Sequence, residues 1–247
     1  MKNYIAQWGA KLTLDNGGER TTVDVYSRDG LDMLSNLWIK SAAEHRLMYE
    51  ATWLGRPVIQ FATDILTIQE LLWELKPDVV IETGVAHGGS LVLSASILEL
   101  IGKGKVIGID IEIRPQNRAA IEAHPLKKRI ELIEGSSIAP DTLAKVRAAA
   151  RGAKSVVVFL DSNHTEAHVL QELELYGPLV TSGSYIVAHD GAQAWVWDIP
   201  HGKREWKDDH PLGAIDKFLA RHPEFTVDAT RNRFGITSSP NGFLRKN

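Results

Sequence analysis

The chain has 247 residues, enough for one large α/β domain with a buried core, and its composition is that of an ordinary globular protein. The net charge of −3 and the lack of any Lys/Arg block exclude a global attraction to nucleic acid. Because the chain contains no cysteine, disulfides, thiolate zinc sites and cysteine nucleophiles are excluded. No apolar run reaches the roughly 18 residues of a membrane helix, and the N-terminus lacks the apolar core of a secretion signal. We therefore expect a cytoplasmic protein with no membrane partner.

Residues 1–75 are predicted to form an N-terminal segment followed by a helical cap. The Asn-Gly-Gly run at 16–18 marks a turn, which fits a short hairpin. From residue 32 to residue 53 apolar side chains recur at helical spacing, which predicts a helix. Asp64 is placed to cap a second helix over 65–75, which ends before a proline.

From residue 76 onward the pattern changes to short apolar strands that alternate with helices. Such alternation is typical of parallel strands joined by helical crossovers, and it predicts a doubly wound, mostly parallel, Rossmann-like sheet. Residues 76–247 are therefore expected to form one compact α/β unit. The expected strands lie at 79–81, 106–110, 130–133, 156–160 and 185–188, and the expected helices at 90–101, 116–123, 141–150 and 165–176.

The C-terminal part of the chain departs from this alternation. Residues 192–210 form a long segment with three tryptophans, which either stack on a ring substrate or anchor the segment by burial. A helix over 212–221 is followed by strand-like runs at 225–227 and 234–237. These two runs are close enough in the sequence to pair as an antiparallel edge of the sheet.

A glycine-rich turn joins the first of these strands to its helix. Gly84 and Gly88 allow the backbone to approach a ligand closely, and the helix that begins at Ser90 offers free N–H groups. A phosphate-binding loop is not matched, because it needs a lysine where Gly89 stands, and the G-x-G-x-x-G dinucleotide fingerprint is not matched either. Glu82 precedes the turn, and its carboxylate suits an amine or a sulfonium but repels a pyrophosphate.

Acidic and small polar residues follow the next strands. Asp110 lies 26 residues beyond Gly84, close to the spacing of the usual ribose-hydroxyl acceptor, and two serines after the third strand fit the edge of an adenine. A site that suits a ribose and a positive charge but has no phosphate-binding motif fits S-adenosylmethionine better than NAD or ATP. The alternative is that the glycines only turn the chain and Asp110 only caps a helix. The candidate cofactor-binding residues are Glu82, Gly84, His87, Gly88, Ser90, Asp110, Ser136, Ser137 and Asp161.

A metal site is expected where the fourth and fifth strands end. Asp161 ends the fourth strand, His189 and Asp190 end the fifth, and these strands are neighbours in the usual doubly wound order. Two carboxylates with water suit Mg²⁺, whereas an imidazole ligand moves the preference toward Mn, Fe, Co or Zn. A bound cation lowers the pKa of an acceptor hydroxyl, and His164 or His189 takes its proton. The catalytic candidates are therefore Asp161, His164 and His189, while His168 is assigned a structural role because H-E-x-x-H is not matched.

Four longer runs resemble the cephalosporin hydroxylase family, whose members are similar to class I methyltransferases. The runs lie at 53–60, 76–90, 159–164 and 239–244, and the resemblance extends from about residue 30 to the C-terminus. It implies a Mg²⁺ site formed by Asp161 and the pair that closes the fifth strand, and a homo-oligomer (a dimer or larger). The family has Glu-Asp where this chain has His189-Asp190. The cofactor contacts that the resemblance implies are Glu82, Gly84, Ser90, Asp110 and the strand end at Asp161.

The residues and the resemblance together predict an S-adenosylmethionine-dependent, metal-assisted O-methyltransferase. Its acceptor is expected to be a hydroxyl of a sugar or of a small secondary metabolite. Two alternatives remain open. The first is an N-methyltransferase that uses His189 as the base for an amine acceptor, and its activity would survive chelation of the metal. A metal-dependent oxidoreductase loses activity when oxygen is excluded, although the missing cysteines and missing dinucleotide fingerprint count against it.

Overall fold

The computed structural model describes residues 3–7 and 10–247, and its centre is a seven-stranded sheet of order β11-β12-β10-β9-β6-β7-β8. The strands from β6 to β10 pair in parallel, and β12 runs antiparallel to both of its neighbours. This confirms the predicted doubly wound, mostly parallel sheet with an antiparallel C-terminal edge. The strands are β6 Val79–Thr83, β7 Lys105–Asp110, β8 Ile130–Glu134, β9 Val156–Leu160, β10 Tyr185–Ala188, β11 Phe225–Val227 and β12 Phe243–Lys246.

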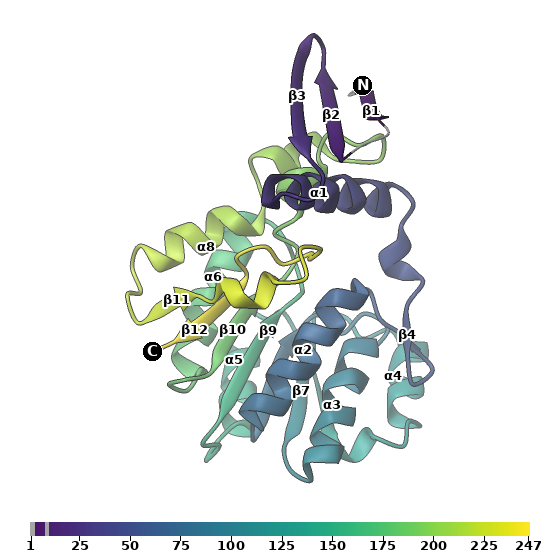
Figure 1. The fold of residues 1–247 in the computed structure, drawn as a ribbon. Coiled ribbons are helices and arrows are strands. Elements are labelled where there is room, and N and C mark those ends of the chain that lie inside the picture. The colour runs from purple at the N-terminus through teal and green to yellow at the C-terminus, as the bar shows by residue number, and fades with distance from the viewer. Residues whose placement is uncertain (1–2, 8–9) are drawn as a thin grey trace.

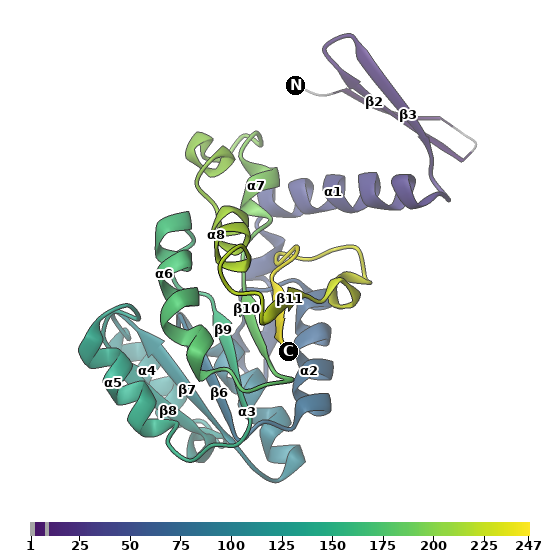
Figure 2. The same ribbon diagram turned by 90° about the vertical axis from the view of Figure 1, so that its left-hand side faces the viewer.

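Helices cover both faces of this sheet, as Figure 2 shows. One core lies between the sheet and α5, α6 and α8, and the other lies between the sheet and α2, α3 and α4. Every residue of β6 and β9 is buried, and both strands begin with an apolar run, as expected for parallel strands between two helical layers. In β6 this run is followed by the buried Glu82 and Thr83 at the carboxyl end. The helices are α2 Ala62–Leu75, α3 Gly89–Ile101, α4 Pro115–Glu122, α5 Pro140–Ala149, α6 Glu166–Tyr176 and α8 Pro211–Leu219.

The N-terminal part adds a small antiparallel sheet and one long helix outside the main sheet. The expected turn at 16–18 joins β2 to β3. The small sheet projects from the body at the N-terminal end of α1 (Figures 1 and 2). The predicted helix over 32–53 is wrong in extent, because α1 ends at Glu44 and Arg46 takes a left-handed φ of 56°. These elements are β1 Asn3–Gln7, β2 Lys11–Asn16, β3 Glu19–Asp24, α1 Arg28–Glu44, the 3₁₀ turn η1 Leu47–Tyr49, β4 Thr52–Trp53 and β5 Arg56–Pro57.

Two further expectations near the site differ from the structure. Asp64 does not cap the second helix, because α2 begins at Ala62 and Asp64 is buried within its first turn. The run at 234–237 does not pair with β11; β12 takes that place, since Gly235 has a φ of 77° and Thr63 Oγ1 donates a hydrogen bond to Ile236 O (2.6 Å). The remaining short turns are η2 Lys127–Arg129, η3 Gly177–Leu179 and η5 Ala229–Asn232.

The segment between β10 and α8 folds over α1. It contains α7 Gln193–Val196 and η4 Arg204–Lys207. Trp195 and Trp206 pack partly buried against a third apolar cluster that includes Ile39 of α1, Phe61 and Val196. Two of the three tryptophans, Trp195 and Trp206, therefore help to anchor this segment by burial. Among the residues that the structure describes, no helix combines the length and apolar character needed to cross a membrane.

Candidate active site

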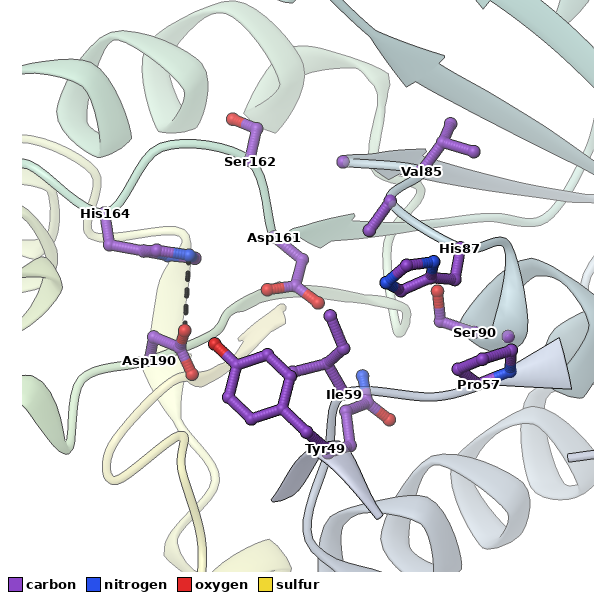
Figure 3. Close-up of a pocket in the computed structure, with 14 residues that line it drawn as sticks. Tyr49, Pro57, Ile59, Val85, His87, Ser90, Asp161, Ser162, His164 and Asp190 are labelled. Atoms are coloured by element: carbon purple, nitrogen blue, oxygen red, sulfur yellow. Dashed lines mark ion pairs between the residues drawn. The ribbon is translucent and has the colours of Figure 1, made fainter. Parts of the chain in front are cut away.

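Three cavities meet beyond the carboxyl ends of β6, β9 and β10. The first, here called the turn cavity, has a volume of about 220 Å³ and lies against the glycine-rich turn (Figure 3). The second, the Asp110 cavity, has about 310 Å³, and the third, the Trp206 cavity, has about 510 Å³. Asp161 lines the turn cavity and the Asp110 cavity, whereas His164 and Asp190 line the turn cavity and the Trp206 cavity. The turn cavity therefore joins the other two.

The glycine-rich turn brings the ends of β6 and β9 into close contact. Gly84 has a φ of 93°, and a Cβ placed there would lie 1.9 Å from the carbonyl oxygen of Asp161. Asp110 Oδ2 accepts hydrogen bonds from the backbone N–H groups of Val85 (2.8 Å) and Ala86 (3.2 Å). The carboxylate of Asp110 thus fixes the turn from the neighbouring strand, and it also faces its own cavity.

Two residues that sequence reasoning did not assign to the site hold this turn from outside. Arg56 Nε and Nη2 donate to the carbonyl oxygen of His87 (2.9 and 2.5 Å). Asn117 Nδ2 donates to the carbonyl oxygen of Ala86 (2.7 Å), and its Oδ1 accepts from Arg56 (3.3 Å). Arg56 belongs to one of the runs that carry the family resemblance, which was the available signal, but Asn117 lies on α4 and no local pattern marks it.

Most of the predicted cofactor-binding residues line these cavities. Gly84, His87 and Ser90 line the turn cavity, and Asp110, Ser136 and Ser137 line the Asp110 cavity. His168 also lines the Asp110 cavity, where its Nε2 lies within hydrogen-bond distance of the hydroxyls of Ser137 (3.2 Å) and Ser162 (3.3 Å).

Glu82 and Gly88 lie just behind the cavity wall. Gly88 has a φ of 81° and is the N-cap of α3, and a Cβ placed there would lie 2.5 Å from the side chain of Ile121. Glu82 is buried; its Oε1 accepts a hydrogen bond from Ser90 Oγ, and its Oε2 has no hydrogen-bond partner among the described residues. Burial raises the pKa of Glu82 to about 8, and the nearby Asp161 carboxylate acts in the same direction.

A group of three potential metal ligands occupies the junction of the cavities. One ligand atom from each of Asp161, His164 and Asp190 lies within 4.8 Å of the others, and His164 Nε2 is 3.2 Å from Asp190 Oδ2 (Figure 3). Burial raises the pKa of Asp161; His189 and His164 oppose that rise, while the carboxylate of Asp190 adds to it. Two carboxylates at one point repel each other, and a divalent cation between them removes that repulsion. The oxygen-rich donor set therefore fits a hard cation such as Mg²⁺.

The third member of this group differs from the expected one. His189 was expected beside Asp161 and Asp190, but the structure places His164 there. His189 continues the pairing with β9 through its backbone N–H, which donates to Leu160 O (3.0 Å). Its buried ring lies with Nδ1 2.9 Å from Ser239 Oγ, so the side chain is directed behind the group rather than into it.

The Trp206 cavity is the largest of the three and lies between α1, η1 and the segment after β10. Tyr49 and Gln60 line both this cavity and the turn cavity, and neither was singled out from the sequence as a site residue. In Figure 3 the Tyr49 hydroxyl points toward Asp190. About half of the residues that line this cavity are apolar, and Arg46, Lys203 and Asp190 are among the polar ones. The apolar residues are Ile39, Ala43, Met48, Ile59, Phe61, Ala192, Val196, Ile199 and Trp206.

This fold and site define a class I S-adenosylmethionine-dependent methyltransferase. The strand order, the glycine-rich turn after the central strand and the acidic residue after the next one provide its architecture. More particularly, residues 45–247 match the family model of rhamnosyl O-methyltransferase/CmcI, so the chain belongs to that family.

Curated relatives and solved structures agree with this assignment. The rhamnosyl O-methyltransferase of Mycobacterium tuberculosis is 32% identical over 203 residues, which are 80% of this chain and 79% of the relative. That of Mycobacterium leprae is 32% identical over 197 residues, covering 78% of this chain and 82% of the relative. The fold resembles CmcI with Mg and S-adenosylmethionine (TM-score 0.58, 19% identity, 81% and 77% of the two chains). It also resembles an O-methyltransferase from Bacillus cereus in complex with S-adenosylhomocysteine (TM-score 0.52, 17% identity, 82% and 84%).

Proposed function

We propose that this methyltransferase transfers the methyl group of S-adenosylmethionine to a hydroxyl of a sugar or a small sugar-containing metabolite, with the assistance of a divalent cation. The observation that carries the proposal is the position of Asp161. It lies between the cavity beside Asp110 and the turn cavity, and it belongs to the three-residue ligand group. A methyl donor in these two cavities and an acceptor in the Trp206 cavity, which His164 and Asp190 line, would meet at the ligand group.

The cofactor is proposed to span two of the cavities. Its adenine and ribose would lie in the Asp110 cavity, with the ribose hydroxyls donating to the Asp110 carboxylate and the adenine beside Ser136 and Ser137. Its methionine part would lie in the turn cavity against Gly84 and Ser90, with Glu82 bonded to Ser90 behind this wall.

Asp161 and Asp190 would hold the cation, with His164 at the edge of the group. When bound, the cation would lower the pKa of the acceptor hydroxyl. The imidazole Nε2 of His164 is placed to take the proton of that hydroxyl, since neutral imidazole is a competent base near neutral pH. Methyl transfer would form a bond from the acceptor oxygen to the methyl carbon while the carbon–sulfur bond breaks, with S-adenosylhomocysteine as the leaving group and the proton on His164.

The acceptor is proposed to bind in the Trp206 cavity. Its volume of about 510 Å³ is sufficient for a glycoside, and Trp206 and Phe61 offer ring faces on which a sugar packs. The name of the mycobacterial relatives, rhamnosyl O-methyltransferase, supports a deoxyhexose as the first acceptor to test. In this arrangement the part of the predicted cap from Ile39 to Phe61 supplies much of the cavity wall.

The proposal is tested with S-adenosylmethionine that carries an isotope-labelled methyl group. The purified chain is incubated with Mg²⁺ and a panel of neutral rhamnosides, a second panel of amines, and each panel again after exhaustive chelation. Labelled methyl ethers that form only with metal are expected. Labelled amines that form equally well after chelation would contradict the O-methyltransferase assignment.

We further propose a cytoplasmic homo-oligomer, a dimer or larger, that binds no nucleic acid. The supporting observations are the missing cysteines, the net charge of −3 and an apolar stripe on α1. Leu31, Leu34 and Trp38 of that stripe are exposed at 43, 39 and 42%. Light scattering coupled to size exclusion measures the assembly, and a monomer at all concentrations would contradict it.

A further inference from the structure

The C-terminal turn, here residues 236–242, packs behind the ligand group, and the proposed chemistry does not use it. It overlaps the run at 239–244 that resembles the cephalosporin hydroxylase family. Ser239, at its centre, has no exposed surface, and Thr237 is also buried. The turn lies between α2 on one side and the end of β10 on the other, through the hydrogen bonds described below. It therefore connects a helix that carries no proposed site residue to the strand end that carries Asp190.

Asp64 fixes this turn to α2. Its Oδ1 accepts a hydrogen bond from Thr237 Oγ1 (2.5 Å), and its Oδ2 accepts from the backbone N–H and the hydroxyl of Ser238 (2.8 and 2.9 Å). Asp64 is only 1% exposed, so these three bonds replace the water that the carboxylate loses on folding. Loss of these hydrogen bonds would leave buried carboxylate oxygens without partners, which is unfavourable. Asp64 therefore holds the turn rigidly against α2.

Ser239 transmits this anchor to His189. The Ser239 backbone N–H donates to Thr237 Oγ1 (2.9 Å), the same hydroxyl that Asp64 holds. The Ser239 hydroxyl lies 2.9 Å from His189 Nδ1, and both side chains are buried. An unbroken series of hydrogen bonds thus runs from Asp64 through Thr237 and Ser239 to the residue before Asp190.

The same turn holds the backbone on both sides of Asp190. The N–H of Ala188 donates to Gly242 O and the N–H of Ala192 donates to Ser238 O, each at 3.0 Å. Between them Asp190 has a left-handed φ of 59°. Aspartate enters this region more readily than most residues with a Cβ, but it stays there only where its surroundings hold it. The backbone bonds to the C-terminal turn flank Asp190 and restrict the chain on both sides of it.

We propose that Asp64 and Ser239 are positioning residues, which hold the strained Asp190 and so determine how tightly the ligand group binds a divalent cation. The inference rests on the proposed metal site, and neither residue touches the cation, the cofactor or the acceptor. A loss of the series of hydrogen bonds lets Asp190 relax out of the left-handed region. Its carboxylate then turns away from Asp161 and His164.

The test is a titration of Mn²⁺, read from the electron paramagnetic resonance signal of the free ion, on Ser239→Ala, Asp64→Asn and a control. The control is Ser184→Ala, because Ser184 is equally buried at the other end of β10 and its hydroxyl has no hydrogen-bond partner among the described side chains. We expect the two positioning variants to bind Mn²⁺ about 10-fold more weakly, in the range that supporting contacts of metal ligands show, with a changed line shape of the bound ion. Ser184→Ala is expected to match the wild type, and the affinity for S-adenosylhomocysteine is expected to stay within a few-fold in all three.

The outcomes separate the inference from the proposed function. A wild-type chain that binds no Mn²⁺ would remove the metal site itself. Wild-type Mn²⁺ affinity and line shape in Ser239→Ala would overturn the positioning role while leaving the metal site intact. If Asp64→Asn fails to fold, Ser239→Ala still tests the positioning role. It removes one buried hydroxyl, and its control Ser184→Ala removes another hydroxyl that is about equally buried.

Discussion

Replacing Glu82 with glutamine is expected to remove a large pH dependence of stability. The carboxyl group is 2% exposed at the end of β6, and burial raises its pKa from the ordinary 4.5 to about 8. A raised pKa in the folded chain means that the protonated form is preferred there. The protonated Glu82 therefore makes its full contribution to the free energy of unfolding below about pH 4.5, and this contribution is lost as the pH rises toward 8.

The magnitude follows from the size of the pKa change. Each pKa unit corresponds to about 1.4 kcal/mol, so a rise from 4.5 to about 8 corresponds to about 5 kcal/mol at full ionisation. About 4 kcal/mol of this falls between pH 5 and pH 9 by linkage. For a chain of this size that change lowers the melting temperature by about 10 °C. Glutamine has nearly the same shape and retains an oxygen for the hydrogen bond from Ser90.

The assay is thermal unfolding of the cofactor-free chain at several pH values, followed by circular dichroism or calorimetry. The wild type is expected to lose about 10 °C more than Glu82→Gln between the two ends of the range. Glu122→Gln, an exposed change on α4, serves as the control and is expected to follow the wild type. Parallel pH profiles for the wild type and Glu82→Gln would refute the account of this buried carboxyl group.

Three further predictions concern the three cavities. Gly84→Ala is expected to abolish measurable binding of S-adenosylhomocysteine and to lower the melting temperature, since the new Cβ would lie 1.9 Å from Asp161 O at a φ of 93°; wild-type binding in calorimetry would contradict the close approach. Asp161→Ala and Asp190→Ala are each expected to lower turnover at least 100-fold and to leave the cofactor affinity within a few-fold; full turnover in both would remove the metal role. Trp206→Ala is expected to raise the KM for the sugar about 10-fold with little change in the KM for the cofactor, and equal changes in both would show that the cavity is not the acceptor site.

The sheet could be predicted from the sequence because its signals are local. Each strand is a short apolar run with a polar residue at its end, and strands that alternate with helices allow few topologies. Asp110 was therefore placed correctly beside the glycine-rich turn, and Asp161 beside Gly84. The bounds of the helices between these strands also agree within one or two residues with the structure.

The differences arise where tertiary contacts override local pattern. His164 rather than His189 joins the ligand group, because the buried ring of His189 pairs with the hydroxyl of Ser239 instead. The run at 234–237 has strand-like composition, yet Asp64 draws it onto α2 and leaves the sheet edge to β12. Neither the contact between His189 and Ser239 nor that between Asp64 and the C-terminal turn can be recognised from a local sequence pattern.

The central claim is that the cavities beside Asp110 and the glycine-rich turn bind S-adenosylmethionine. The measurement that tests it most directly is calorimetric titration of the wild-type chain with S-adenosylmethionine and with S-adenosylhomocysteine, each with and without Mg²⁺. We expect both to bind at one site per chain with micromolar dissociation constants, and Asp110→Ala to weaken both. No heat from either ligand at millimolar concentration, with or without Mg²⁺, would contradict the claim.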